Sequence, residues 1–132
     1  MQIAAAAGRV FAYMSDAAAL GEWAIGCRQA RDIGGGLLVG NSDLSGGPLY
    51  VRIKADAAGL LITYQAGETP ERLTPRVMAR ILGAPFVANE KTTCLLSLIA
   101  WRTVDMDETR WRAIIRAHEQ EVLAIKQRLE NN

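Results

Sequence analysis

The sequence has few of the residue types that build metal, redox and disulfide sites. Its 132 residues include one histidine and two cysteines. Cys27 and Cys94 lie far apart and form neither a CxxC unit nor a cluster with metal-ligand spacing. Two half-buried thiols in a reducing compartment are the simpler interpretation. We therefore expect no metal and no cofactor.

The sequence also lacks an excess of charge and a long apolar run. Lysine and arginine number 15 against 14 acidic residues, so the formal net charge is +1. A chain with so little net charge has no field that attracts nucleic acid or an anionic membrane surface. No apolar run reaches the roughly 20 residues of a membrane span. Arg9 and Asp16 interrupt the alanine-rich start, where a signal peptide would be apolar. These absences predict a cytoplasmic protein with no nucleic-acid partner and no membrane span.

Signatures of several enzyme classes are missing as well. The sequence contains no nucleophile elbow, P-loop, Rossmann glycine pattern or zinc-ligand spacing. The glycines at 34–36 precede no predicted helix, so they indicate a turn and not a phosphate-binding loop. What is present is a 50% share of hydrophobic residues in a chain of 132. This length and composition predict one domain spanning residues 1–132.

The opening segment has the pattern of two short helices. The first run, from Arg9 to Met14, places its large apolar residues on one face at helical spacing. Ser15-Asp16 then interrupts the pattern with two residues that favour helix caps. A second run over 17–22 ends at Trp23. We expect the pair to close one end of a sheet, with Trp23 as the apolar anchor.

The middle of the chain has the pattern of strands separated by turns. Glycine-rich and Asp-Ala-Ala-Gly breaks bound the candidates. The segment Leu73–Gly83 could start as a capped helix at Thr74-Pro75, but its alternation of apolar and polar residues favours a strand. The predicted strands are Leu37–Ser42, Leu49–Ala55, Leu60–Ala66, Leu73–Gly83 and Thr92–Thr103.

The end of the chain predicts one long helix. Asp105 followed by Glu108 has the spacing of a capping box, and nothing interrupts the helical pattern from there to Leu129. The only histidine, His118, falls on the apolar stripe, while Glu119 and Glu121 flank it and are expected to be exposed. The stripe consists of Trp111, Ile115, Val122, Ile125 and Leu129.

A short strand, two helices, a run of antiparallel strands and a long final helix make an α+β order. Such a sheet curls, and the amphipathic helix lies in its concave side. With this order, the chain resembles the START-like superfamily, also called Bet v 1-like or SRPBCC. It is most similar to bacterial members described as polyketide cyclase/dehydrase or lipid-transport-like. The residues that carry the resemblance are Ile3, Ala5, Val10-Phe11, Ser15-Asp16 and Trp23 at the start, and His118-Glu119, Leu123, Lys126, Leu129 and Glu130 at the end. The resemblance implies a helix-grip fold over essentially the whole chain.

Two positions depart from the family pattern. Ala6 stands where the family usually has proline, so the first helix is expected to begin less sharply. Only Met1–Ala5 is available for the first strand, which is usually longer. A short first strand leaves part of the sheet edge exposed, and an exposed edge can pair with another chain. A homodimer is therefore an open alternative to a monomer.

The resemblance implies a ligand cavity between the sheet and the final helix, and strand alternation predicts its lining. On the last strand both faces are apolar, with Leu96 and Leu98 on one and Leu95, Ile99 and Trp101 on the other, so periodicity does not assign the inward face. Arg52, Arg76 and Arg80 are expected outside, as a solvated face or as a phosphate-binding row. The candidate ligand-binding set is Trp23, Val51, Ile53, Ile62, Tyr64, Val77, Ile81, Leu96, Leu98, Trp111, Ile115 and His118.

No catalytic set is evident from the sequence. His118 is the best candidate for a general acid or base, followed by Tyr64. The alternative is a core histidine hydrogen-bonded to a buried partner such as Tyr64. Three functions remain: binding or carriage of a hydrophobic small molecule such as a lipid, polyketide or aromatic compound, a cyclase/aromatase-type enzyme, and a protein-interaction module of the Hsp90-activator kind. The first is favoured, and the third predicts a filled interior.

Overall fold

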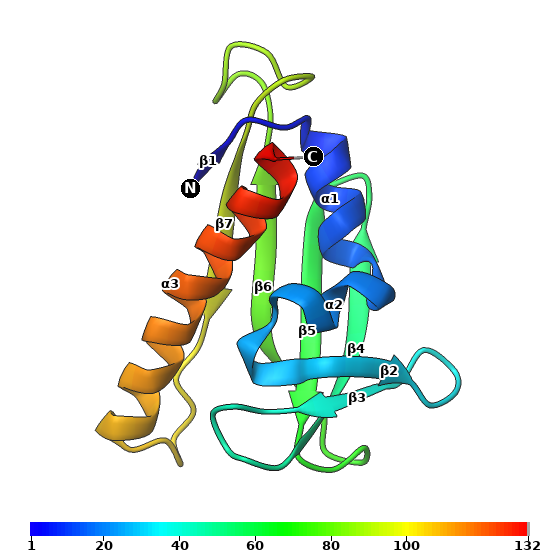
Figure 1. Cartoon of the computed structure of the whole chain (residues 1–132), viewed down its shortest axis with the longest axis vertical. Helices are drawn as coiled ribbons and strands as arrows, with labels where there is room; N and C mark the ends of the chain where they lie inside the picture. The colour runs from blue at the N-terminus through cyan, green and yellow to red at the C-terminus, as the bar shows by residue number, and fades with distance from the viewer. Residues whose placement is uncertain (132) are drawn as a thin grey trace.

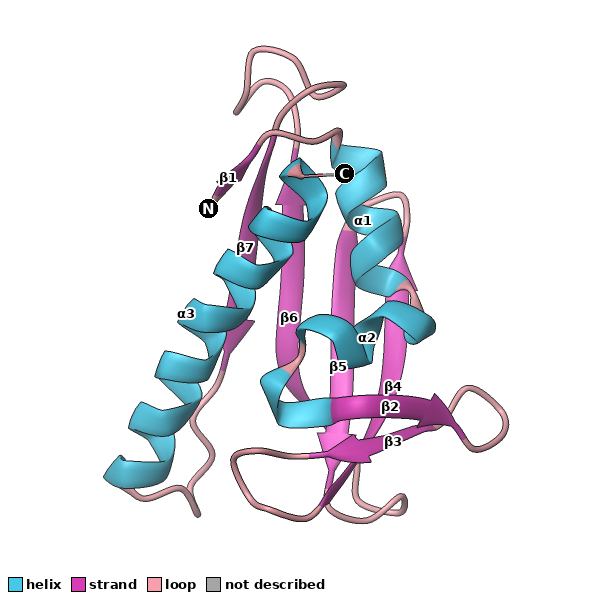
Figure 2. Cartoon of the chain, in the orientation of Figure 1, coloured by secondary structure: helices cyan, strands magenta, loops and turns pink. Residues whose placement is uncertain are grey.

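The computed structural model describes residues 1–131, which form one antiparallel sheet with helices on its concave side (Figures 1 and 2). This is the helix-grip α+β fold that the sequence predicts. In chain order the elements are β1 (Gln2–Ile3), α1 (Ala7–Ser15), α2 (Ala17–Trp23), the short 3-10 helix η1 (Ile25–Cys27), β2 (Arg28–Asp32), β3 (Leu38–Asn41), β4 (Pro48–Asp56), β5 (Leu61–Gly67), β6 (Thr74–Leu82), β7 (Cys94–Ala100) and α3 (Glu108–Glu130).

The sheet is curved and open, with strand order β1-β7-β6-β5-β4-β3-β2. Figure 1 shows β2 and β3 running across the lower ends of β4 and β5, while α3 runs beside β7. Helix α1 packs against β4, β5 and β6, and α3 packs against β1, β7, α2 and η1. The predicted strands are confirmed, including the segment 73–83 that could also have begun a helix. Strand β2 was not predicted individually, because its sequence, Arg-Gln-Ala-Arg-Asp, has no apolar alternation.

The two short helices form because one residue ends the first and begins the second. Asp16 is the C-cap of α1 and the N-cap of α2, and its carboxylate accepts a hydrogen bond of 2.9 Å from the Ala18 N–H. Helix α1 begins after Ala6, whose side chain offers no cap. Met14 and Trp23 are both buried, so each helix turns its apolar side toward the sheet.

Helix α3 begins later than predicted. Its N-cap is Asp107, whose carboxylate accepts a hydrogen bond of 2.7 Å from the Arg110 N–H. The capping box at Asp105 is therefore wrong, and Asp105 accepts a hydrogen bond from the Thr103 hydroxyl in the preceding turn. An aspartate at either position can cap a helix, so spacing alone could not choose between them.

The buried face of α3 also differs from the predicted stripe. Ile125 and Leu129 are buried as expected, but Ile115 is 40% exposed and Glu121 is buried. The expectation that Glu121 is exposed is wrong, because its carboxylate accepts a hydrogen bond from the Ile25 N–H of η1. Helical periodicity cannot reveal such a partner. Ala117 completes the buried set, which is Ala117, Glu121, Ile125 and Leu129.

The first strand is short, as expected, and it pairs only with the start of β7. Ile3 lies opposite Cys94, and the Met1 and Leu96 backbones exchange two further hydrogen bonds. The inward face of β7 carries Leu96, which is 1% exposed, whereas Ile99 on the other face is 38% exposed. The structure thus settles the face that periodicity left open. Pairing of two chains along this edge stays a prediction.

Candidate ligand cavity

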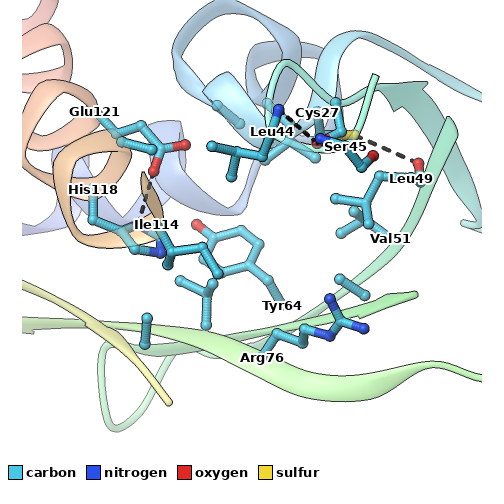
Figure 3. A pocket seen from close by; sticks show the side chains of 18 of the residues that line it. Cys27, Leu44, Ser45, Leu49, Val51, Tyr64, Arg76, Ile114, His118 and Glu121 are labelled. Atoms are coloured by element: carbon cyan, nitrogen blue, oxygen red, sulfur yellow. Dashed lines mark hydrogen bonds and ion pairs between the residues drawn. The ribbon is translucent and has the colours of Figure 1, made fainter. Parts of the chain in front are cut away.

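A cavity of about 320 Å³ lies between the sheet, the α2–η1 lid and α3 (Figure 3). Volumes of this size are at the lower end of the range for small-molecule sites, about 300–1,000 Å³. Most of the wall is apolar, with a few polar groups that come from β5 and its end, from β6, from α3 and from the loop between β3 and β4. The apolar lining residues include Leu20, Trp23, Ala24, Leu49, Val51, Ala66, Val77, Ala100, Ile114 and Ala117.

The aromatic part of the wall joins the lid to the sheet. The rings of Trp23 and Tyr64 meet edge to face, with centroids 5.7 Å apart and an interplanar angle of 73°. Trp23 is 3% exposed, and its Nε1 finds no hydrogen-bond acceptor among residues 1–131. Trp23 is therefore both part of the core and part of the cavity wall.

Tyr64 uses its hydroxyl to hold helix α1. The hydroxyl donates a hydrogen bond of 2.5 Å to the Met14 carbonyl oxygen at the end of that helix. Burial raises the pKa of Tyr64 well above its usual range, and the nearby carboxylate of Glu121 raises it further. The Tyr64 hydroxyl therefore stays neutral in ordinary solution and anchors the end of α1 to β5.

His118 and Glu121 form a polar pair on the α3 side of the cavity. The imidazole Nδ1 lies 2.7 Å from Oε1 of Glu121, three residues later on the same helix. The contact has ion-pair length without hydrogen-bond geometry, and neither atom has another partner within residues 1–131. Glu121 Oε2 accepts a hydrogen bond of 2.9 Å from the Ile25 N–H of η1. The buried neighbour of His118 is thus Glu121, and not Tyr64, which the alternative interpretation gave as an example.

Arg76 lines the cavity because of a bulge in the sheet. Tyr64 pairs with Val77 and Gln65 pairs with Pro75, so the register shifts by one residue at Arg76. Strand alternation placed Arg76 on the outer face, and that expectation is wrong. Its Nε is shielded from solvent and has no hydrogen-bond acceptor in the described part of the chain. Arg80, beyond the bulge on the same strand, is exposed as expected.

The cavity opens between the β3–β4 loop and the end of β7. Leu44 and Trp101 line this mouth and are 42% and 45% exposed. Arg110 of α3 lies 3.9 Å from Glu68, which follows β5, and both also line the cavity. Such an exposed pair contributes little stability.

Cys27 lies in the wall without being a reactive group. Burial raises the pKa of its thiol to about 11, and its Sγ lies 3.8 Å from the Leu49 carbonyl oxygen. A thiol of that pKa carries almost no thiolate at neutral pH, so Cys27 is a weak nucleophile.

The predicted site residues divide among three places. Trp23, Val51, Tyr64, Val77 and His118 line the cavity. A second, shallower hollow between β7 and α3 is lined by Leu96, Leu98, Trp111, Ile115 and again His118. The remaining three, Ile53, Ile62 and Ile81, pack in or against the core, in the part of the sheet where α1 fills the concave face.

Sequence reasoning missed the charged residues of the wall: it placed Arg76 and Glu121 outside, and it did not single out Glu68 or Arg110. The bulge that turns Arg76 inward cannot be recognised from the alternation of apolar and polar residues along the strand. Glu121 sits four residues before Ile125 and four after Ala117, so a stripe with spacing of four contained it, but its charge argued for exposure. Among residues 1–131 there is no cluster of three or more potential metal ligands. Within the same residues no helix is both long and apolar enough to cross a membrane.

A comparison with protein-family models finds no match, and neither does a comparison with curated proteins. Solved structures do match. A START superfamily protein from Mycobacterium smegmatis is 13% identical with a TM-score of 0.69, over 99% of this chain and 94% of that one. The ZhuI aromatase/cyclase from Streptomyces sp. R1128 is 18% identical with a TM-score of 0.64, over 98% and 90%.

A third match is to BexL, a di-domain aromatase/cyclase of the BE-7585A biosynthetic pathway. It is 17% identical with a TM-score of 0.69, over 96% of this chain but 43% of that one. At these identities the likeness concerns the fold and not the chemistry. The chain therefore has the START-like, helix-grip fold, which it shares with START proteins and polyketide aromatase/cyclases.

Proposed function

We propose that this protein binds or carries a hydrophobic small molecule in the cavity between the curved sheet and α3. The observation that carries the proposal is the cavity itself, about 320 Å³ of space with a mostly apolar wall. Apolar space of this size is costly to leave empty, and burying a ligand's apolar surface there is favourable. The solved structures that share the fold are consistent with this use. The two free cysteines are buried, and we propose a cytoplasmic location on that ground.

The proposal is tested by replacing a small residue of the cavity wall with a larger one, so that the new side chain occupies the cavity. Ala100 at the end of β7 lines the cavity, whereas its neighbour Ile99 points to the other face and is exposed. We expect Ala100→Phe to weaken binding of the neutral fluorescent probe phenylnaphthylamine by about tenfold or more, and Ile99→Phe to leave it unchanged. Ala66→Leu fills the space from β5 and serves as a second variant if Ala100→Phe does not fold. Equal probe binding by all folded variants would contradict the proposal.

A second function is supported by the His118–Glu121 pair. An imidazole held at 2.7 Å from a buried carboxylate and facing a cavity is an arrangement that can move a proton on a bound substrate. The fitting reaction is of the cyclase/aromatase kind, in which the cavity folds a reactive polyketide chain. His118→Gln is then expected to keep probe binding and abolish turnover of a polyketide-type substrate. Unchanged turnover would remove His118 from the mechanism.

The protein-interaction alternative has less support. It predicts a filled interior, and the interior contains a cavity. Exposed apolar side chains such as Ile99 and Ile115 lie on the β7–α3 side, but no feature of that side indicates a partner. Ligand binding therefore remains the primary proposal.

A further inference from the structure

Not every charged side chain around the cavity has an oppositely charged group within ion-pair distance. Five charged or ionisable side chains other than those of Cys27 and Tyr64 line it, namely Glu68, Arg76, Arg110, His118 and Glu121. Glu68 is near Arg110 at 3.9 Å, and Glu121 is near His118 at 2.7 Å. Within residues 1–131, no carboxylate lies within ion-pair distance of Arg76. The guanidinium is thus the one arginine of the wall with no carboxylate within ion-pair distance, although its charge reaches the more distant Asp105, whose pKa it helps to lower.

The guanidinium is also short of hydrogen-bond acceptors. An arginine carries five N–H donors and is charged at every accessible pH. Among the described residues none accepts a hydrogen bond from Arg76, and its Nε is closed off from solvent. A half-buried charge without a hydrogen-bonded partner is unfavourable, because the wall around it has a lower dielectric than water. The outer nitrogens of the side chain are the ones a ligand in the cavity can reach.

Arg76 lies on one side of the cavity, away from the buried acidic group of the wall. Figure 3 shows Arg76 on a different side of the cavity from His118 and Glu121. The bulge at Tyr64/Gln65 fixes that placement, since it turns the Arg76 side chain toward the concave face. A ligand oxygen at Arg76 is therefore kept away from the carboxylate of Glu121.

We propose that the ligand of this cavity is an apolar molecule ending in a carboxylate, which binds with its two oxygens on the guanidinium of Arg76. This inference rests on the proposed function and adds the chemical class of the ligand. A planar carboxylate matches the fork of donors on a guanidinium and neutralises a single positive charge. A dianionic phosphate would leave one of its two negative charges without a counter-charge in a mostly apolar wall. The apolar body of the ligand fills the remainder of the space, along Val77, Ala66 and Ile114.

The test compares acids with their neutral alcohols. Decanoic acid with decanol, and naphthoic acid with naphthylmethanol, are titrated against bound phenylnaphthylamine at neutral pH, where the acids are ionised. The chains are the wild type, Arg76→Gln, Arg76→Lys and, as the matched control, Arg80→Gln. Arg80 is on the same strand but exposed on the outer face, so its variant removes the same charge away from the cavity.

We expect the wild type and Arg80→Gln to bind at least one acid about 10- to 100-fold more tightly than its alcohol, a ratio typical of a charge-assisted contact in a partly buried site. Arg76→Gln should lose that preference while it still binds the neutral probe, and Arg76→Lys should keep part of it. No preference in the wild type, or a preference that survives in folded Arg76→Gln, would overturn the inference and leave the proposed function standing. If the wild type binds neither the probe nor any of the four compounds, the proposed function itself fails and the inference fails with it.

Discussion

Glu121 and Ile25 connect the long helix to the lid: the carboxylate Oε2 of Glu121 accepts a hydrogen bond of 2.9 Å from the Ile25 N–H. The two residues are 96 positions apart, and the contact closes the cavity on the side where η1 meets α3. The other carboxylate oxygen lies beside His118. One buried acid therefore holds the lid and sets the environment of the only histidine.

Removing the Glu121 carboxylate is expected to destabilise the fold. Glu121→Ala leaves the Ile25 N–H without its acceptor and opens space beside α3, which should cost about 1–3 kcal/mol. Glu119→Ala, two residues away on the exposed side of the same helix, should change stability by no more than about 0.5 kcal/mol. Urea unfolding followed by circular dichroism measures both. Equal values for the two variants would show that the contact with η1 contributes nothing.

The raised pKa of Tyr64 predicts that the folded protein loses stability in alkaline solution. Its folded-state pKa is raised above the ordinary value of 10, so the folded protein holds the phenolic proton more tightly than the unfolded chain does. The stabilising free energy that comes from this pKa difference is fully present below about pH 10 and is lost progressively as the pH rises above it. Tyr64→Phe should cost about 1 kcal/mol at neutral pH through the lost hydrogen bond to Met14.

The difference between wild type and Tyr64→Phe should therefore shrink as the pH rises above 10. Tyr13 and Cys27, whose pKa values are raised to about 12 and about 11, titrate in both proteins and cancel from the comparison. Unfolding free energies measured at neutral pH and near the highest pH at which both remain folded give the answer. A difference that is constant or grows with pH would contradict the assigned role of the buried hydroxyl.

Asp16 predicts a capping effect at the junction of the two short helices. Asp16→Ala removes the acceptor for the Ala18 N–H and should cost about 1 kcal/mol, whereas Asp16→Asn keeps an acceptor there and should cost much less. Thermal unfolding of the two variants measures the difference. If asparagine were as damaging as alanine, the effect of Asp16 would come from its charge and not from its cap.

The fold was largely predictable because local patterns and the family resemblance agree with each other. The Ser15-Asp16 break is visible in the sequence and is a real helix boundary. The alternation over 73–83 correctly predicted β6. Boundaries were less predictable, as the cap of α3 shows. Asp105 and Asp107 are equivalent in type, and the choice between them depends on how Thr103 and Arg102 turn the chain before the helix.

The candidate site was less predictable, because its charged residues depend on tertiary contacts. Arg76 faces the cavity through a one-residue shift in pairing with β5, and the sequence of β6 alone does not contain that shift. Glu121 is buried because a backbone N–H from η1 meets it, and no helical period identifies a partner so distant in sequence. The apolar wall, in contrast, follows from strand alternation at Val51 and Val77.

The most direct test of the central claim is native mass spectrometry of the gently purified chain after incubation with an excess of apolar extract from cells. The account predicts an added mass on the wild type and on Ile99→Phe that denaturation releases, and little or none on Ala100→Phe. A wild type that stays free of any small molecule under these conditions, or an Ala100→Phe variant that retains as much as the wild type, would contradict ligand binding in this cavity.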